Sequence, residues 1–126
     1  MPAPVTSKQV GRRGEALAVK FLKAQGYRIL SRGFRTRYGE VDIIARDGPV
    51  LCFIEVKTRT QEDFGPPAAA VTATKMKRLA QSAQVYLLKK KQREVPVRFD
   101  VVAVLESAAG VKLELFRGAF ENPLGF

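Results

Sequence analysis

Two short stretches decide the fold of this chain: Gly39-Glu40-Val41-Asp42-Ile43-Ile44 and Phe53-Ile54-Glu55-Val56-Lys57. Each is dense in β-branched and apolar residues, which is typical of a β-strand. Each also carries ionisable side chains where a half-buried strand would normally carry apolar ones. Because side chains alternate along a strand, the two acids of the first stretch share a face, and Glu55 shares a face with Lys57 about 7 Å away. We therefore expect acids and an amine to converge.

The residues between the two stretches are turn formers. Positions 46–49 read Arg-Asp-Gly-Pro and predict an antiparallel hairpin. Two registers are open. The register that pairs the residues flanking Gly48-Pro49 sets Asp42 opposite Glu55, whereas a turn centred on Gly48 sets Glu40 there instead. Either register opposes two carboxylates.

Like charges opposed across two strands are destabilising unless something neutralises them. Hard carboxylate oxygens without nitrogen or sulfur ligands favour Mg²⁺ or Mn²⁺. The alternative is an ordinary ion-pair set of Glu55 and Lys57 on a solvated face of an edge strand. Against that alternative stands the apolar run at 50–56, which is typical of a central strand covered on both faces, where unpaired charges are costly.

The composition limits the class of protein. At 126 residues the chain is long enough for one hydrophobic core and too short for two. No apolar run approaches the ~20 residues of a membrane span, so no membrane partner is expected. Residues 1–6 lack the apolar core of a signal peptide. We expect a flexible tail over 1–6, a single domain over 7–126, and a cytoplasmic location.

The chain has no histidine, and this absence excludes Ser-His-Asp and Cys-His triads and the usual zinc sites. Its one cysteine, Cys52, lies in the apolar strand and is interpreted as a small buried hydrophobe. Acid, base and metal chemistry must therefore fall to Asp, Glu, Lys or Tyr.

The net charge of +10 comes from 22 basic and 12 acidic residues. A surplus of this size in a small domain favours a polyanionic partner, because neutralising phosphates releases counterions. Nucleic acid is the default candidate. A basic ribosome-associated protein would show the same charge.

Apolar periodicity and breakers predict the order αβββαββ, an α/β domain with a mixed sheet flanked by helices. The first helix runs from Ser7 to Gln25 and stops at Gly26; the second begins after an N-cap at Thr72. Residues 61–68 are expected to be a loop. The expected strands are 27–34, 39–47, 50–58, 97–106 and 111–116, the last two joined by a turn at 107–110.

Two groups on the predicted helices bear on function. Glu15 lies at the start of the core-facing stripe of the first helix. Alone it would be an ordinary solvated residue, but beside the other carboxylates we interpret it as part of a site. The second helix carries Lys75 and Arg78 in its first turns, where cations oppose the helix dipole and a bound phosphate would offset the cost. The candidate phosphate contacts are Arg35, Arg37, Lys75 and Arg78.

A helix with Glu15, a strand with Asp42 and a next strand with Glu55-Val56-Lys57 resemble the PD-(D/E)xK, or restriction-endonuclease-like, nuclease superfamily, which includes Holliday junction resolvases. Over roughly residues 8–121 the chain more closely resembles the YraN-like family of uncharacterised bacterial proteins. Two positions depart from these patterns: Val41 where the superfamily usually has Pro, and Gly33 where the family commonly has Asn. The motifs carrying the closer resemblance are the two stretches above, Phe64-Gly65, Val71-Thr72 with Lys75, Arg98-Phe99-Asp100-Val101-Val102, and Ala119-Phe120.

The resemblance implies a restriction-endonuclease-like domain and a Mg²⁺- or Mn²⁺-dependent endonuclease acting on DNA, including branched DNA. Asp42 and Glu55 would hold the metal with the backbone carbonyl of Val56, and Glu15 would complete the ligand set. Lys57 would position or deprotonate the attacking water.

Glu40 would lie in a supporting shell around those ligands. Two other functions remain open: a non-catalytic nucleic-acid-binding module, and an RNA- or ribosome-associated accessory protein with a structural acidic cluster. The sequence also leaves open whether the chain forms a homodimer.

Overall fold

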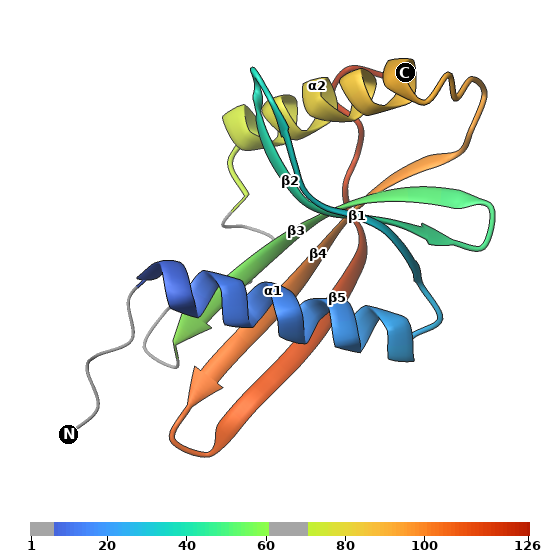
Figure 1. The fold of residues 1–126 in the computed structure, drawn as a ribbon. Coiled ribbons are helices and arrows are strands. Elements are labelled where there is room, and N and C mark those ends of the chain that lie inside the picture. Colours follow the sequence, from blue (N-terminus) through green and yellow to red (C-terminus); the bar gives the residue numbers. More distant parts are fainter. Residues whose placement is uncertain (1–6, 61–70) are drawn as a thin grey trace.

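Two helices pack on opposite faces of one five-stranded sheet (Figure 1). The computed structural model describes residues 7–60 and 71–126, so the expected tail at 1–6 and loop at 61–68 lie outside the described residues. The chain order is αβββαββ, as predicted. The elements are α1 (Ser7–Ala24), β1 (Arg28–Thr36), β2 (Gly39–Asp47), β3 (Val50–Thr60), α2 (Ala73–Lys89), β4 (Val97–Ser107) and β5 (Gly110–Phe120).

The strands lie in chain order across the sheet, with β3 in the middle. All neighbours pair antiparallel except β3 and β4, which are parallel and are connected through α2. Thr72 caps α2 by accepting a hydrogen bond from the Lys75 N–H, which confirms the predicted N-cap. The strand β5 extends to Phe120, four residues beyond the expected end.

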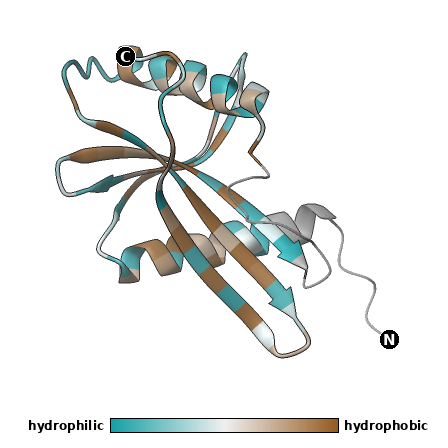
Figure 2. Ribbon diagram, turned by 180° about the vertical axis from the view of Figure 1, so that it is seen from behind, coloured by the Kyte–Doolittle hydropathy of each residue, from teal (hydrophilic) through white to brown (hydrophobic). Residues whose placement is uncertain are grey.

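Side chains of β3 enter two hydrophobic clusters, one under each helix. Phe53 lies in the cluster under α2 and contacts Tyr86 edge-on, at 5.8 Å between ring centroids. Ile54 lies in the cluster under α1 with Cys52, which is fully buried as predicted. Figure 2 shows hydrophobic residues concentrated where the strands cross the middle of the molecule. The sequence prediction of a central strand covered on both faces is confirmed.

Asp100 on β4 is fully buried and hydrogen-bonded on all sides. Its carboxylate accepts from Arg98 Nε at 2.8 Å, the Tyr27 hydroxyl at 2.8 Å and the Gly118 N–H at 2.9 Å. Gly118 has φ of +59° and lies in an irregular part of β5, where the β4–β5 register shifts opposite Asp100. We call these four residues the Asp100 network. Through one carboxylate the network connects the residue before β1, the strand β4 and the end of β5.

Candidate functional site

The strand β2 changes its alternation at Asp42. Val41 and Ile44 lie in the cluster under α2, whereas Ile43 and Ala45 lie in the cluster under α1. Regular alternation would place Val41 and Ile43 on the same face. The strand therefore twists between them, and Asp42 occupies the position where the change of face occurs.

At the same point β2 separates from β3. The hairpin pairs Asp47 with Val50 and continues to Ile43 opposite Ile54. This is the first of the two predicted registers, and its continuation brings Asp42 to the level of Glu55. The carboxylate of Asp42 accepts the Val56 N–H at 2.8 Å, so a side chain takes the place of a backbone carbonyl.

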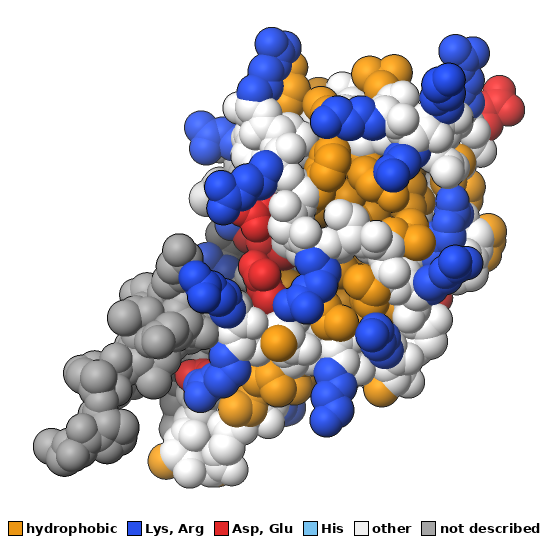
Figure 3. Space-filling model, viewed as in Figure 1, with side chains coloured by type: hydrophobic (Ala, Val, Ile, Leu, Met, Phe, Trp, Pro, Cys, Tyr) orange, Lys and Arg blue, Asp and Glu red, His pale blue; other side chains and the backbone are white. Residues whose placement is uncertain are grey.

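Three carboxylates meet at this point. Glu15 from α1 joins Glu40 and Asp42 from β2, and one oxygen of each lies within 4.8 Å of the others. We call these three residues the acid cluster. In Figure 3 acidic side chains gather between the two helices, with lysine and arginine side chains on either side. Glu15 therefore lies beside the two acids of β2, and its role in a functional site stays a prediction.

A glycine holds α1 close enough for this contact. A Cβ added at Gly14 would overlap the Oγ1 atom of Thr58 on β3. Gly14 therefore lets the helix approach the strand more closely than a larger residue would allow. Because Glu15 is the next residue, this approach sets the position of its carboxylate against Asp42.

The carboxylate of Glu55 has a separate partner. Its side chain is almost fully buried and forms an ion pair with Lys75 from the first turn of α2. Lys75 was predicted as a phosphate contact from its place in the sequence, and the structure adds that its ammonium lies inside the acidic site. Burial of a carboxylate is costly unless a cation or hydrogen bonds compensate it, and Lys75 supplies that compensation.

Burial and neighbouring charges shift the pKa values of the acids. Burial, followed by the charge of Glu55, raises the pKa of Asp42 from its ordinary 3.8 to about 7, although the Val56 N–H acts in the opposite direction. Burial and the charge of Glu40 raise the pKa of Glu15 above its ordinary value. These carboxylates are thus held together against their mutual repulsion in the metal-free protein.

The amine predicted to be catalytic, Lys57, lies on β3 two residues beyond Glu55 and is partly buried. Among the described residues it forms no ion pair. A partly buried ammonium without an internal anion is available to an external one. Val56, whose carbonyl was predicted as a ligand, lies between Glu55 and Lys57 on β3, and its N–H donates to Asp42.

The predicted phosphate contacts occupy different surroundings. Arg35 lies 3.4 Å from Glu40, so it borders the acid cluster. Arg37 packs against Tyr38, with its guanidinium 4.8 Å from the ring centroid. Arg78 lines a cavity beside Glu40. The structure thus brings Arg35, Lys75 and Arg78 to the border of the acids, while Arg37 lies with Tyr38 at the β1–β2 turn.

Two placements were missed from the sequence. Glu40 was expected in a supporting role, but it lies in the three-carboxylate cluster, whereas Glu55 is paired with Lys75. The sequence did indicate that Glu40 lies near Asp42, because residues two apart on a strand share a face. No sequence signal placed Lys75 on Glu55, since that contact depends on how α2 packs.

The donor set fits a hard divalent cation. Within residues 7–60 and 71–126, the acid cluster supplies three carboxylate oxygens at close range, with a fourth carboxylate, Glu55, acting electrostatically on Asp42. Oxygen-only ligands suit Mg²⁺ and Mn²⁺. A cation would also relieve the repulsion that raises the pKa of Asp42.

Fold and site together define a mixed α/β domain with an acidic centre between two helices and a basic surround. The chain belongs to the uncharacterised protein family UPF0102, whose model matches residues 14–104.

Among its relatives is a UPF0102 protein from Geotalea uraniireducens, 47% identical over 116 residues that cover 91% of each chain. Another, from Symbiobacterium thermophilum, is 48% identical over 90% of this chain and 98% of its own. A third, from Dictyoglomus thermophilum, is 42% identical over 87% of this chain and 93% of its own. Among the described residues, no helix combines the length and apolarity that crossing a membrane requires.

Proposed function

We propose that this protein is a Mg²⁺- or Mn²⁺-dependent endonuclease of the PD-(D/E)xK superfamily that acts on DNA, including branched DNA. The observation that carries the proposal is the acid cluster around Asp42, at the point where β2 leaves β3. Two elements far apart in the sequence, α1 and β2, place carboxylates there, and burial together with neighbouring acids raises the pKa of Asp42 and of Glu15. That cost of ionisation supports a role in holding a cation, because perturbed carboxylates gather at functional sites.

Each acid has its own role in binding the metal in this proposal. Asp42 would be the central metal ligand, with Glu15 and Glu40 beside it. Glu55 would join when Lys75 leaves it, and the Val56 carbonyl remains a candidate ligand by resemblance. The cation supplies Lewis-acid stabilisation of the charge on the phosphate that is attacked.

The amines would act on the substrate. Lys57 carries a positive charge that no described carboxylate neutralises, so it is suited to orient a water molecule and to stabilise the negative oxygens of the transition state. Lys75 would pass from Glu55 to a substrate phosphate. Arg35 and Arg78 border the acids and would contact neighbouring phosphates.

A second candidate function is non-catalytic binding of nucleic acid. The Lys75–Glu55 ion pair favours it, because an internal cation already compensates one of the expected metal ligands. In that case the net charge of +10 serves binding alone.

A nuclease assay separates the two functions. Purified protein is incubated with linear, flapped, single-stranded and four-way DNA in Mg²⁺ or Mn²⁺. We expect cleavage of at least one substrate, loss of cleavage in Lys57→Ala, and nearly unchanged DNA affinity in that variant, because a catalytic amine acts chiefly on the transition state. Lys77→Ala, an exposed lysine on α2, is the matched control.

Two other outcomes would assign a different function to the protein. Binding to all four DNAs without cleavage by either metal would leave the non-catalytic binder. Absence of DNA binding, with co-sedimentation of the protein with ribosomes, would replace both functions with that of an accessory protein whose acidic cluster is structural.

A further inference from the structure

A cavity of about 350 Å³ adjoins the acid cluster. One wall is the β1–β2 turn with the start of β2, where Tyr38 and Glu40 lie. The other wall is the N-terminal half of α2, with Lys75 and Arg78. Glu40 belongs to both the cavity and the acid cluster. A chain molecule bound at the acids could therefore extend into the cavity.

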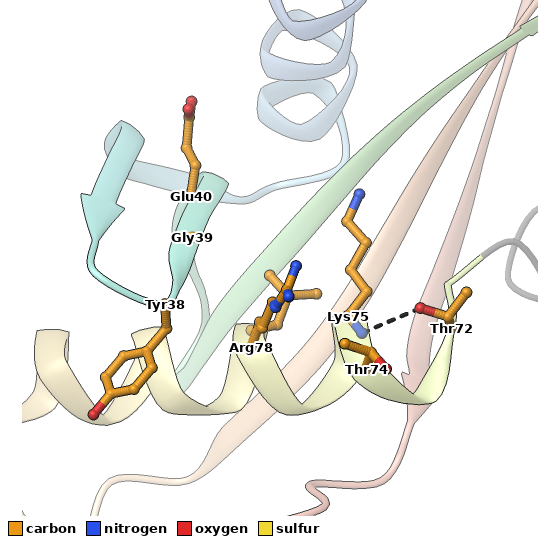
Figure 4. Close-up of a pocket in the computed structure, with 8 residues that line it drawn as sticks. Tyr38, Gly39, Glu40, Thr72, Thr74, Lys75 and Arg78 are labelled. Atoms are coloured by element: carbon orange, nitrogen blue, oxygen red, sulfur yellow. Dashed lines mark hydrogen bonds between the residues drawn. The ribbon is translucent and has the colours of Figure 1, made fainter.

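The α2 wall of the cavity offers positive charge. Figure 4 shows Lys75 and Arg78 pointing from α2 toward the side on which Glu40 lies. Arg78 has no carboxylate partner among the described residues, whereas Lys75 is engaged with Glu55. The Thr72 cap is already satisfied by the Lys75 N–H at 3.2 Å. The unused charge is therefore that of the Arg78 guanidinium, whose planar donors suit a phosphate.

The rest of the lining offers an aromatic and an aliphatic surface. Tyr38 and Leu79 line the cavity, and the Tyr38 ring points away from Glu40 in Figure 4. Arg37 packs on that ring, with its guanidinium 4.8 Å from the ring centroid, and donates to the Tyr38 hydroxyl at 2.6 Å. An aromatic residue beside a cation that pairs with no described carboxylate is a combination that binds single-stranded nucleic acid through base stacking and phosphate contact.

The size of the cavity limits the occupant. Its volume lies at the lower end of the range for small-molecule sites, and a double helix, whose major groove alone is about 12 Å wide, is too large to enter. One nucleotide of an unpaired strand is of the right class: an anion with an attached flat ring.

We propose that this cavity binds one unpaired nucleotide of the strand that reaches the acid cluster, with its phosphate on Arg78 and its base against Tyr38. The inference rests on the proposed function in so far as the ligand is nucleic acid. It selects the substrate class: single strands, flaps and junctions with an unpaired nucleotide are preferred to continuous duplex.

Fluorescence anisotropy in EDTA tests the proposal without cleavage. The probes are a fluorescein-labelled single-stranded DNA 12-mer and a duplex of the same length and sequence. Arg78→Ala and Tyr38→Ala should each weaken binding of the single strand by about tenfold, with a smaller effect on the duplex. Lys77→Ala, which removes a neighbouring exposed charge outside the cavity lining, should change both affinities by less than about twofold.

Tyr38→Phe keeps the ring and should retain most of the affinity, which separates stacking from loss of fold; thermal melts of each variant verify folding. Equal weakening by Arg78→Ala and Lys77→Ala would overturn the proposal, since it would show diffuse attraction. Duplex binding that is as tight and as sensitive as single-strand binding would also overturn it. If the protein does not cleave DNA, the measured preference for unpaired strands would still support nucleotide binding in the cavity. If it cleaves DNA without preferring unpaired strands, the nuclease proposal is kept and the inference about the cavity is rejected.

Discussion

Asp42 and Asp100 lie on strands of the same sheet, yet their surroundings are opposite. Asp100 is fully buried and accepts hydrogen bonds from Arg98, Tyr27 and Gly118. Burial alone would raise its pKa, but those hydrogen bonds hold it below the ordinary value. Asp42 is less buried and accepts from the Val56 N–H, and its pKa is raised to about 7.

The contrast teaches how to separate a structural acid from a functional one. A carboxylate that stabilises the fold is surrounded by donors and is easily ionised. A carboxylate reserved for a ligand has other acids as neighbours and is costly to ionise until the ligand arrives. By this criterion the Asp100 network is architecture, and the acid cluster is the proposed site.

The largest effect should come from removing the charge of Asp100. Asp100→Asn leaves Arg98 with Asp47 as its remaining acid, and we expect a loss of about 3 kcal/mol in the free energy of unfolding, since a buried pair is broken from one side. Urea denaturation measures it. Asp47→Asn, at a more exposed position, should cost less. An Asp100→Asn protein as stable as the parent would break the comparison.

Close packing of α1 against β3 sets the position of Glu15 in the acid cluster, and Gly14→Ala tests this. The added methyl group would overlap Thr58 Oγ1, so we expect a loss of about 1–2 kcal/mol from overpacking. The double variant with Thr58→Ala should recover most of that loss, because the remaining Thr58 Cβ would lie at an ordinary 3.6 Å. Absence of recovery in denaturation experiments would place the strain elsewhere.

Asp42→Asn should have the opposite sign to Asp100→Asn. The amide oxygen can still accept the Val56 N–H while the repelling charge is removed, so in EDTA at pH 8 we expect a gain of about 1 kcal/mol, equivalent to less than one pKa unit. In 10 mM Mg²⁺ the parent should be stabilised by mass action and the variant should not. Melting temperatures with and without metal measure both effects, and a variant stabilised equally by metal contradicts the assignment of Asp42.

The two aspartates should also respond oppositely to pH in EDTA. The pKa of Asp42 is about 7 in the folded protein against an ordinary 3.8, so between these values the unfolded chain binds fewer protons and stability falls as pH rises, with the full penalty above about pH 7. Asp100 has a lowered pKa, so its contribution is present above 3.8 and is lost as pH falls through the folded value. Unfolding free energies from pH 3 to 8 should show the decline toward neutral pH reduced in Asp42→Asn, and the loss toward acid pH reduced in Asp100→Asn.

The smallest effect concerns Lys75. If the acids bind metal as proposed, Lys75→Met removes the cation that competes for Glu55, and Mn²⁺ affinity by calorimetry should tighten about fivefold, the equivalent of about 1 kcal/mol. Lys77→Met lies on the same helix without that contact and should leave the affinity unchanged. Weaker Mn²⁺ binding in Lys75→Met than in Lys77→Met would show that Lys75 supports the metal instead of competing with it.

Local rules made much of the fold predictable. Turn residues gave the β2–β3 hairpin, although both of its registers satisfied the turn chemistry and the structure selects the pairing of Asp47 with Val50. The apolar run around Phe53 indicated the central strand, and the helical stripe indicated that Glu15 faces inward. Each of these signals depends on neighbours within a few residues.

The unpredicted features depend on distant contacts. The Asp100 network joins positions 27, 98, 100 and 118, and the irregular pairing of β5 that presents the Gly118 N–H has no local signature beyond a glycine. The change of face at Asp42 results from the twist of the sheet. The contact of Lys75 with Glu55 requires the crossover through α2 to be in place.

That crossover sets an order on folding during synthesis. Every acid and amine of the candidate site precedes position 79, so all of them are synthesised before β4 and β5. Antiparallel neighbours such as β1–β2 and β2–β3 form from local contacts, while the parallel β3–β4 pair must wait for a long loop to close. The segments that carry the mutually repelling carboxylates are therefore present before two of the five strands of the sheet are available. We expect a nascent or truncated chain without β5 to lack a formed acid cluster, because β5 completes the sheet beside β4 and supplies the Gly118 N–H to buried Asp100.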